Sequence, residues 1–353
     1  MKSLSAHIIK KSIRHTALVA VALGMGACDP ILDNEDGDCT VRHHVTFKYD
    51  YNMLGVDAFH TQVECVNLYA FDADSTLAYT VPCTRDELAT MGGRMEVPFD
   101  PRNYHLVAWC HRTGCTTTQL PSLACGTSHL KELTCRIGGR TQASDGCTEV
   151  SEIGPIFHGM RERDPQALPL NPEDELNPTY QIPLMKNTNT LRIVLQNLSD
   201  APLSANDFRF TIEEDNGLMH FDNTLLPDEQ LTYVPFHTSD GKVDYEKGTR
   251  TSTSATTLNM AVAEFSIGRL MADRRPLLTV SNRTTGHTVL SIPLTDYLKI
   301  ARSQYLSDMS DQEYFDREDA YSITFFLNDD QTWMNAAILV NSWRVVLQDV
   351  DLD

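Results

Sequence analysis

The sequence predicts a mainly β protein built from antiparallel sandwiches, with short helices near the C-terminus. Three observations support this fold class. The first strand candidate alternates between two faces, short segments rich in branched and aromatic residues recur between turn signals, and helix-like patterns are confined to a region near the C-terminus. The chain has 353 residues, more than one hydrophobic core usually serves, so we expect two domains at residues 41–184 and 185–353.

The N-terminal domain is expected to begin with a half-buried strand at residues 41–51. Its sequence, VRHHVTFKYDY, alternates strictly and places Val45, Phe47 and Tyr49 on one face. Further strands are predicted at 63–71 and 104–110, each preceded or followed by turn residues. Residues 113–159 are rich in Ser, Thr, Gly and Cys and lack clear periodicity. A loop of this length is either functional or held in place by disulfides.

The C-terminal domain is expected to follow a linker, rich in Pro, Asn and acidic residues, that ends in a strand at residues 164–184. Its strands are predicted at 191–198, 207–214, 231–236, 259–267, 276–282 and 288–294. Thr295 is expected to cap one helix, and Ser310 with Glu313 forms a capping box for a second. Two strands, at 321–327 and 335–348, are expected to close the domain.

The N-terminus has the features of a secretory signal at residues 1–27. Basic residues precede a short apolar run, which is too short to span a bilayer core of about 20 apolar residues. The run ends in Met25-Gly26-Ala27-Cys28, which resembles the lipoprotein box of bacteria. This resemblance implies cleavage between Ala27 and Cys28 and a lipid on the Cys28 thiol. The alternative is an ordinary signal peptide with a chance cysteine beside its cleavage site.

Residues 28–40 are predicted to form an acidic tether. The acids there are interrupted by Pro30, Asn34 and Gly37 and cannot bury enough apolar surface to fold alone. The stretch resembles the export signals that send lipoproteins of Bacteroides-like bacteria to the cell surface. A calcium loop is rejected because its twelfth position would be His43 instead of Glu. We therefore predict no metal site and no cofactor.

The net charge of −19 limits the partners of this chain. An acidic body disfavours binding to nucleic acid, which requires basic surface. It also disfavours a basic membrane-binding patch, so attachment to the outer membrane is expected to depend on the lipid.

Eight cysteines besides Cys28 are candidates for disulfides, because an even number in an exported chain favours pairing. They are Cys39, Cys65, Cys83, Cys110, Cys115, Cys125, Cys135 and Cys147. The sequence does not fix their pairing, and buried free thiols are the alternative. All eight precede residue 148, which divides a Cys-rich first half from a second half without cysteine.

Several segments, taken in order, resemble the anchor and accessory subunits of type V fimbriae in Bacteroides-like bacteria. These segments are YDYNMLGVDAFHTQVECVNLYAFD, NYHLVAWC, FSIGRLMADRRPLLTV, IPLTDYL, SDQEYFDREDAYSITFFL and NSWRVV. The resemblance implies two tandem transthyretin-like sandwiches in a surface-exposed outer-membrane lipoprotein, which holds a fimbria on the cell and binds shaft or accessory subunits. Such subunits assemble by β-strand addition. Residues 335–348 are a candidate for that exchange, and a closing core strand is the alternative.

Cleavage after Arg42 would distinguish a shaft subunit from an anchor. The shaft subunits of this family mature by proteolysis after an Arg near the N-terminus, and Arg42 is the first Arg after Cys28. Cleavage there would free the body from its lipid. An anchor is expected to keep this bond, and a tip or polymerising subunit is expected to lose it.

Other functions are less well supported by the sequence. No nucleophile elbow, metalloprotease motif, phosphate loop or dinucleotide fingerprint is present, and the paired acids lie at strand ends and turns, so we predict no catalytic residues and no enzyme. The alternatives are a fimbrial tip or accessory adhesin with host or bacterial surface ligands, and a glycan-binding surface lipoprotein. The tryptophans Trp109, Trp333 and Trp343 lie in or beside apolar strands and are expected in the core.

Overall fold

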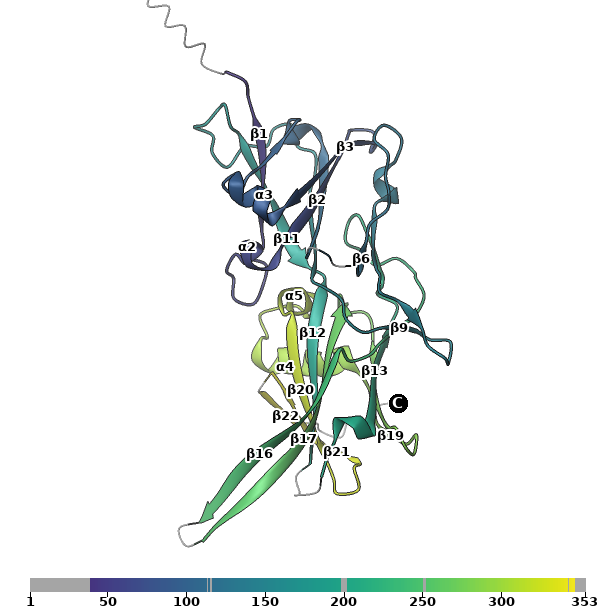
Figure 1. Cartoon of the computed structure of the whole chain (residues 1–353). Helices are drawn as coiled ribbons and strands as arrows, with labels where there is room; N and C mark the ends of the chain where they lie inside the picture. The colour runs from purple at the N-terminus through teal and green to yellow at the C-terminus, as the bar shows by residue number, and fades with distance from the viewer. Residues whose placement is uncertain are drawn as a thin grey trace, which may run out of the picture. The chain divides into compact units, whose positions relative to one another are not determined.

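The computed structural model describes residues 39–112, 114, 116–197, 202–249, 252–341 and 343–346. Residues from Arg42 onward form one compact unit. The described chain is mainly β and sandwich-like, with short helices, which confirms the predicted fold class (Figure 1). Most strand pairs are antiparallel among the described strands. Three pairs are parallel: β1 (His43–Lys48) with β11 (Thr179–Lys186), β9 (Thr148–Val150) with β15 (Leu231–Tyr233), and β12 (Thr188–Asn197) with β20 (Ala320–Leu327).

The first sheet contains the predicted N-terminal strands. Its spatial order is β3 (Leu77–Thr84), β2 (Cys65–Phe71), β5 (His105–His111), β10 (Ile156–Arg161), β11 (Thr179–Lys186), β1 (His43–Lys48) and β4 (Met95–Val97). The alternation in β1 is confirmed, since Val45, Phe47 and Tyr49 are all buried. One face of this sheet packs on a core of its own, to which α2 (Phe59–Gln62) and α3 (Arg85–Thr90) each contribute a buried residue.

The segment 113–159 is held by packing and strand pairing, which the sequence did not reveal. Its short strands are β6 (Thr118–Gln119), β7 (Thr134–Ile137), β8 (Thr141–Gln142) and β9 (Thr148–Val150). Leu133, Cys135 and Ile137 are fully buried in the same hydrophobic cluster as Trp109 of β5. The strand β7 also pairs with β14 (Leu218–His220), and β9 pairs with β15, both from the second half of the chain. The segment therefore joins the two halves of the chain.

The predicted linker lies within the first sheet. Residues 164–178 connect β10 to β11, and these two strands are neighbours in the same sheet, so the linker interpretation is wrong for this stretch. The side chains of Asn171 and Asp174 fold the excursion by accepting the N–H groups of Thr179 and Asn177. The terminal strand is confirmed as β11. One residue, Asn187, separates β11 from β12, and the predicted division at 184/185 stays a prediction.

The second half of the chain forms two further sheets and shares a small third one with β6 and β7. The order of one is β16 (His237–Thr249), β17 (Ser252–Gly268), β12 (Thr188–Asn197), β20 (Ala320–Leu327), β21 (Trp333–Val340) and β22 (Trp343–Val346). The order of the other is β19 (Thr288–Pro293), β18 (Leu277–Asn282), β13 (Phe208–Glu214), β15 (Leu231–Tyr233), β9 and β8. The strand β14 (Leu218–His220) pairs with β7, which pairs with β6.

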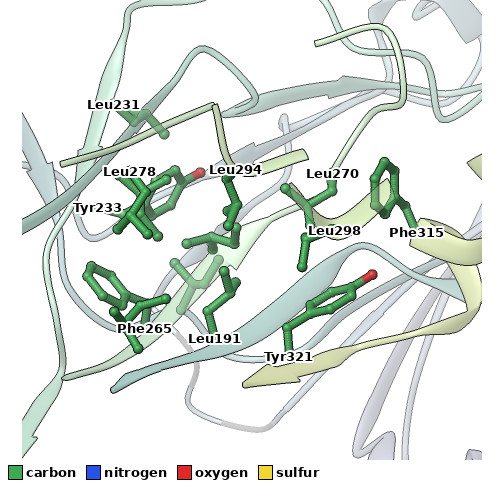
Figure 2. Packing of buried hydrophobic residues seen from close by; sticks show 14 of the residues in the cluster. Leu191, Leu231, Tyr233, Phe265, Leu270, Leu278, Leu294, Leu298, Phe315 and Tyr321 are labelled. Carbon is green, nitrogen blue, oxygen red and sulfur yellow. The ribbon is translucent and has the colours of Figure 1, made fainter. Parts of the chain in front are cut away.

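The core of the second half lies between these two larger sheets. Figure 2 shows Leu191 and Phe265 from one sheet opposite Tyr233 and Leu278 from the other. All four side chains are fully buried. The strand predicted at 321–327 is confirmed as β20, along which buried and less buried residues alternate strictly because one face packs on the core.

Two helices close one side of this core. In α5 (Asp311–Arg317) the Ser310 hydroxyl accepts the Glu313 N–H at 3.1 Å, as predicted, but the Glu313 carboxylate accepts from Arg317 instead of completing a capping box. In α4 (Leu294–Tyr305) the N-cap is Pro293, so the predicted cap at Thr295 is wrong. The buried Thr295 hydroxyl donates to the Arg274 carbonyl oxygen at 2.6 Å, which explains the residue type.

A buried histidine makes the stability of this fold depend on pH. His158 packs against Trp109 and its Nε2 lies 2.7 Å from the Phe221 carbonyl oxygen, to which the neutral ring donates. Burial lowers the pKa of His158 from its ordinary 6.5 to about 4. The unfolded chain therefore binds a proton more readily than the folded chain between these values, and folding stability should fall as pH falls through this window.

We expect the loss to reach about 3 kcal/mol by pH 4, relative to pH 7. Urea titrations at several pH values would measure it against His158→Gln, which cannot gain the proton. The variant should show a shallower dependence on pH between 6.5 and 4. Equal slopes for both chains would contradict the assignment.

Candidate functional site

The predicted lipid-attachment residues Ala27 and Cys28 lie outside the described residues. Their roles stay predictions. The described chain starts at Cys39, which is exposed. Among the described helices, none is both long and apolar enough to cross a bilayer.

Arg42 lies where the chain enters the first sheet. Its side chain is exposed, but its backbone is engaged: the Arg42 N–H donates to the Leu176 carbonyl oxygen at 2.7 Å. The His44 N–H donates to the Pro178 carbonyl oxygen at 3.0 Å. The Arg42–His43 bond is thus flanked on both sides by backbone hydrogen bonds to the 164–178 excursion. A protease that binds its substrate as a free extended segment would have to break this pairing first.

β1 is an interior strand of its sheet. It pairs parallel to β11 from His44 opposite Thr179 to Lys48 opposite Pro183, and antiparallel to β4 from His43 opposite Val97. Cleavage after Arg42 would leave this strand with the body and remove only the residues before it. His43 and His44 alternate along the strand, and each has a pKa lowered mainly by burial, as expected of ordinary strand histidines.

The other end of the chain presents an edge strand. The prediction of one strand at 335–348 is wrong, because β21 and β22 form a hairpin that turns at Asn341. Asn341 has φ of 47°, a left-handed conformation that Asn tolerates better than most residues. Its side chain accepts the Ser322 N–H at 2.8 Å, and its N–H donates to the Ser322 carbonyl oxygen. These contacts fix the turn and explain why the apolar run does not continue as one strand.

The two strands of this hairpin differ in their support. In β21, Ile338 and Val340 are fully buried in the core, which makes this strand the closing core strand considered as the alternative. β22 ends the sheet order in the described chain and pairs there with β21 alone, over residues 343–346. An edge strand of this kind leaves one row of backbone N–H and C=O groups open to a partner.

The cysteines that the structure describes lie on different strands and loops. Cys83 and Cys110 are buried on strands that flank β2, each opposite Val66, so their backbones lie two strand spacings apart, about 10 Å. A disulfide between them would need closer backbones. Burial raises the pKa of the Cys83 thiol to about 11, and burial likewise raises the pKa of Cys110 and Cys135. Cys125 is exposed, Cys115 lies outside the described residues, and the disulfides stay predictions.

The paired acids at strand ends and turns are Asp72 with Asp74 and Glu213 with Glu214, and each pair has a member with a structural role. Asp72 accepts the N–H groups of Asp74 and Thr76 and so closes a turn. Burial raises the pKa of Glu214, which pairs with the Arg274 guanidinium at 3.4 Å. Trp109 is fully buried and Trp333 packs against the core, so neither presents an open platform for stacking on a sugar.

A buried polar cluster at Asn187 was missed by sequence reasoning. The side-chain amides of Asn187 and Asn223 bond to each other at 2.6 and 3.1 Å. Arg269 donates to the Asn223 carbonyl oxygen at 2.7 Å and forms a bidentate pair with Asp316 at 2.9 and 3.0 Å. The available signal was Asn187 and Arg269, isolated polar residues that directly follow apolar strands, but their partners lie far away in sequence.

This architecture is that of a mainly β, sandwich-like protein, in which β1 is an interior strand and β22 is an edge strand among the described residues. The family model of fimbrillin-A associated anchor proteins Mfa1 and Mfa2 matches residues 35–349. The chain belongs to this family, which confirms the resemblance drawn from its sequence.

Solved structures agree with this assignment. A candidate adhesin from Bacteroides thetaiotaomicron is 27% identical with a TM-score of 0.71, and the match covers 88% of this chain and 98% of that one. A candidate polysaccharide-binding protein from the same species is 29% identical with a TM-score of 0.69, covering 88% and 99%. The fimbrial anchor protein Mfa2 from Porphyromonas gingivalis has the same fold, with 16% identity, a TM-score of 0.59 and coverage of 88% and 100%. No curated protein matches this chain.

Proposed function

We propose that this protein anchors a fimbria to the outer membrane, through a lipid on Cys28, and binds the neighbouring subunit by β-strand addition. The observation that best supports an anchor is the engaged backbone on both sides of the Arg42–His43 bond. An anchor must keep its tether joined to its body, and this bond is the one whose cleavage would release the body. Membership in the anchor-protein family supports the same role.

We expect the chain in cells to start at Cys28 and not at His43. The pairing of Arg42 and His44 with the excursion should slow cleavage by an arginine-specific protease in the folded state. Mass spectrometry of the N-terminal peptide from membrane fractions measures this directly. A chain that starts at His43 would contradict the anchor function and favour a polymerising or tip subunit.

The strand that offers its edge to the partner in this proposal is β22, which is shorter than the segment 335–348 predicted from the sequence. Its pairing with β21 spans residues 343–346, whereas β21 is retained by Ile338 and Val340 in the core. A strand from another subunit can extend the sheet by pairing with the open backbone edge of β22. This addition leaves the sandwich core unchanged.

Deleting residues 343–353 should abolish capture of the shaft subunit in a pull-down, because the backbone edge offered to the partner is lost. The truncated chain should still fold, since Ile338 and Val340 remain in place. Retained cooperative unfolding by circular dichroism is the control. Undiminished capture by a folded truncated chain would place the binding surface elsewhere.

An adhesin is the second candidate, because the two more similar solved structures are described as a candidate adhesin and a candidate polysaccharide-binding protein. The burial of Trp109 and the packing of Trp333 count against sugar stacking at these residues. Binding on a glycan array that is lost in Trp333→Ala would favour this function over the anchor.

A further inference from the structure

The parallel pairing of β1, the strand that follows the predicted tether, determines how the fold resists a pulling force. β1 runs parallel to β11, so the N-terminal ends of the two strands lie together and so do their C-terminal ends. The tether enters at the N-terminal end of β1. The second half of the chain is joined to the C-terminal end of β11 through Asn187, and Figure 1 shows β11 running on into β12.

Tension between the tether and the second half of the chain would therefore act at opposite ends of this strand pair. The strands would be drawn along each other, and all hydrogen bonds of the ladder would share the load. If β1 were antiparallel to β11, both forces would act at the same end and the bonds would break one after another. The additional bonds from Arg42 to Leu176 and from His44 to Pro178 lengthen the parallel ladder at its loaded end.

The contacts that follow β11 along the chain would transmit this force to the second half of the chain. Asn187 is fully buried and is held by its paired amide bonds to Asn223, which Arg269 holds in turn. The next strand, β12, pairs along most of its length with β17 on one side and with β20 on the other. The β20 pairing is again parallel, from Thr190 opposite Ala320 to Asn197 opposite Leu327. The β1–β11 ladder has fewer paired residues than the β12–β20 ladder, so of these two parallel ladders it should yield first.

We propose that the fold is a load-bearing clamp, in which β1 is sheared against β11 when the tether and the second half of the chain are pulled apart. The inference rests on the proposed anchor function for its biological purpose. Its mechanical content depends only on the strand arrangement. The pulling agent is a second protein bound to the C-terminal half, of the class that adds a strand at a sheet edge.

Single-molecule force spectroscopy on the chain from Cys28 to Asp353 tests the clamp in two geometries. The first, which we call end to end because its forces act at opposite ends of the β1–β11 pair, pulls between an N-terminal handle and a tag inserted beside Asp329, in the exposed turn after β20. The second pulls between the same N-terminal handle and a tag inserted beside Leu168, which is 82% exposed and precedes β11 in the excursion. In the second geometry both forces act at the N-terminal ends of β1 and β11, so the same ladder is peeled open.

We expect the first rupture force to be at least about twofold higher in the end-to-end geometry than in the peeling geometry at the same loading rate, because forced unfolding is governed by the unfolding barrier. Equal or lower force end to end would overturn the clamp. A matched pair of variants adds a second readout. Backbone N–H groups two residues apart in a strand point to the same neighbouring strand, and the His44 N–H points to the β11 side. Thr46→Pro therefore removes an N–H that faces β11. His43→Pro instead removes an N–H that faces β4.

Thr46→Pro should lower the end-to-end force toward the peeling value, and His43→Pro should leave it close to that of the unaltered chain. An unchanged force in a folded Thr46→Pro chain would also overturn the clamp. If that variant fails to fold, the two geometries on the unaltered chain still decide. If the force difference between the two geometries is found but the chain is absent from the membrane, the clamp is supported and the anchor function is rejected. If the chain is membrane-bound but the two forces do not differ, only the clamp is rejected.

Discussion

Replacing Cys28 by serine should release the protein from the membrane fraction into the soluble fraction, together with any fimbria that it holds. The predicted lipid is the only attachment that the account offers. Each buried methylene of an acyl chain contributes about 0.8 kcal/mol to membrane binding, so loss of the chains removes most of the affinity. The net charge of −19 provides no basic substitute.

The matched control for this experiment is Cys39→Ser, which removes an exposed thiol from the same predicted tether and leaves the predicted lipid site unaltered. Cell fractionation with immunoblotting should find Cys39→Ser in the membrane and Cys28→Ser outside it. A serine variant that stays fully membrane-bound would contradict the lipid-anchor account.

Asp316→Ala should be among the most destabilising single substitutions in the second half of the chain. The side chains of Arg269 and Asp316 are 10% and 9% exposed, and the variant would leave the guanidinium buried without its carboxylate. Breaking a buried pair in this way costs about 4 kcal/mol, because the remaining charge is desolvated and uncompensated. Urea unfolding followed by circular dichroism would measure the loss.

Glu313→Ala is the control, since its pair with Arg317 lies on the same helix but is about one-third exposed. Its loss should be below about 1 kcal/mol. The double variant Arg269→Met with Asp316→Ala should recover part of the stability, because it removes the stranded charge. Similar losses for Asp316→Ala and Glu313→Ala would show that the buried pair does not hold this junction.

The local patterns in the sequence were sufficient to predict the fold class and many of the longer strands. Buried and less buried residues alternate along β1, as its sequence predicts, and along β20. The Ser310 hydroxyl caps α5, as its spacing from Glu313 predicts. These features depend on neighbours within one element. The first strand was predicted to begin at residue 41 and begins at His43, so Arg42 lies at its entry.

Features that depend on distant partners were not predictable from one sequence. The strands within 113–159 are too short to show a period, and their pairing with β14 and β15 depends on residues about 80 positions later. The turn at Asn341 depends on Ser322, and the role of Thr295 depends on Arg274. The direction of the β1–β11 pairing, on which the clamp rests, is likewise a property of topology and not of local pattern.

The measurement that tests the central claim most directly is the position of the protein on intact fimbriae. Gold-labelled antibody in electron microscopy, applied to cells that still bear filaments, locates it relative to the outer membrane. The account predicts label where each filament meets the cell and no label along or at the end of the filament. Label at the distal tips would contradict an anchor and identify a tip subunit instead.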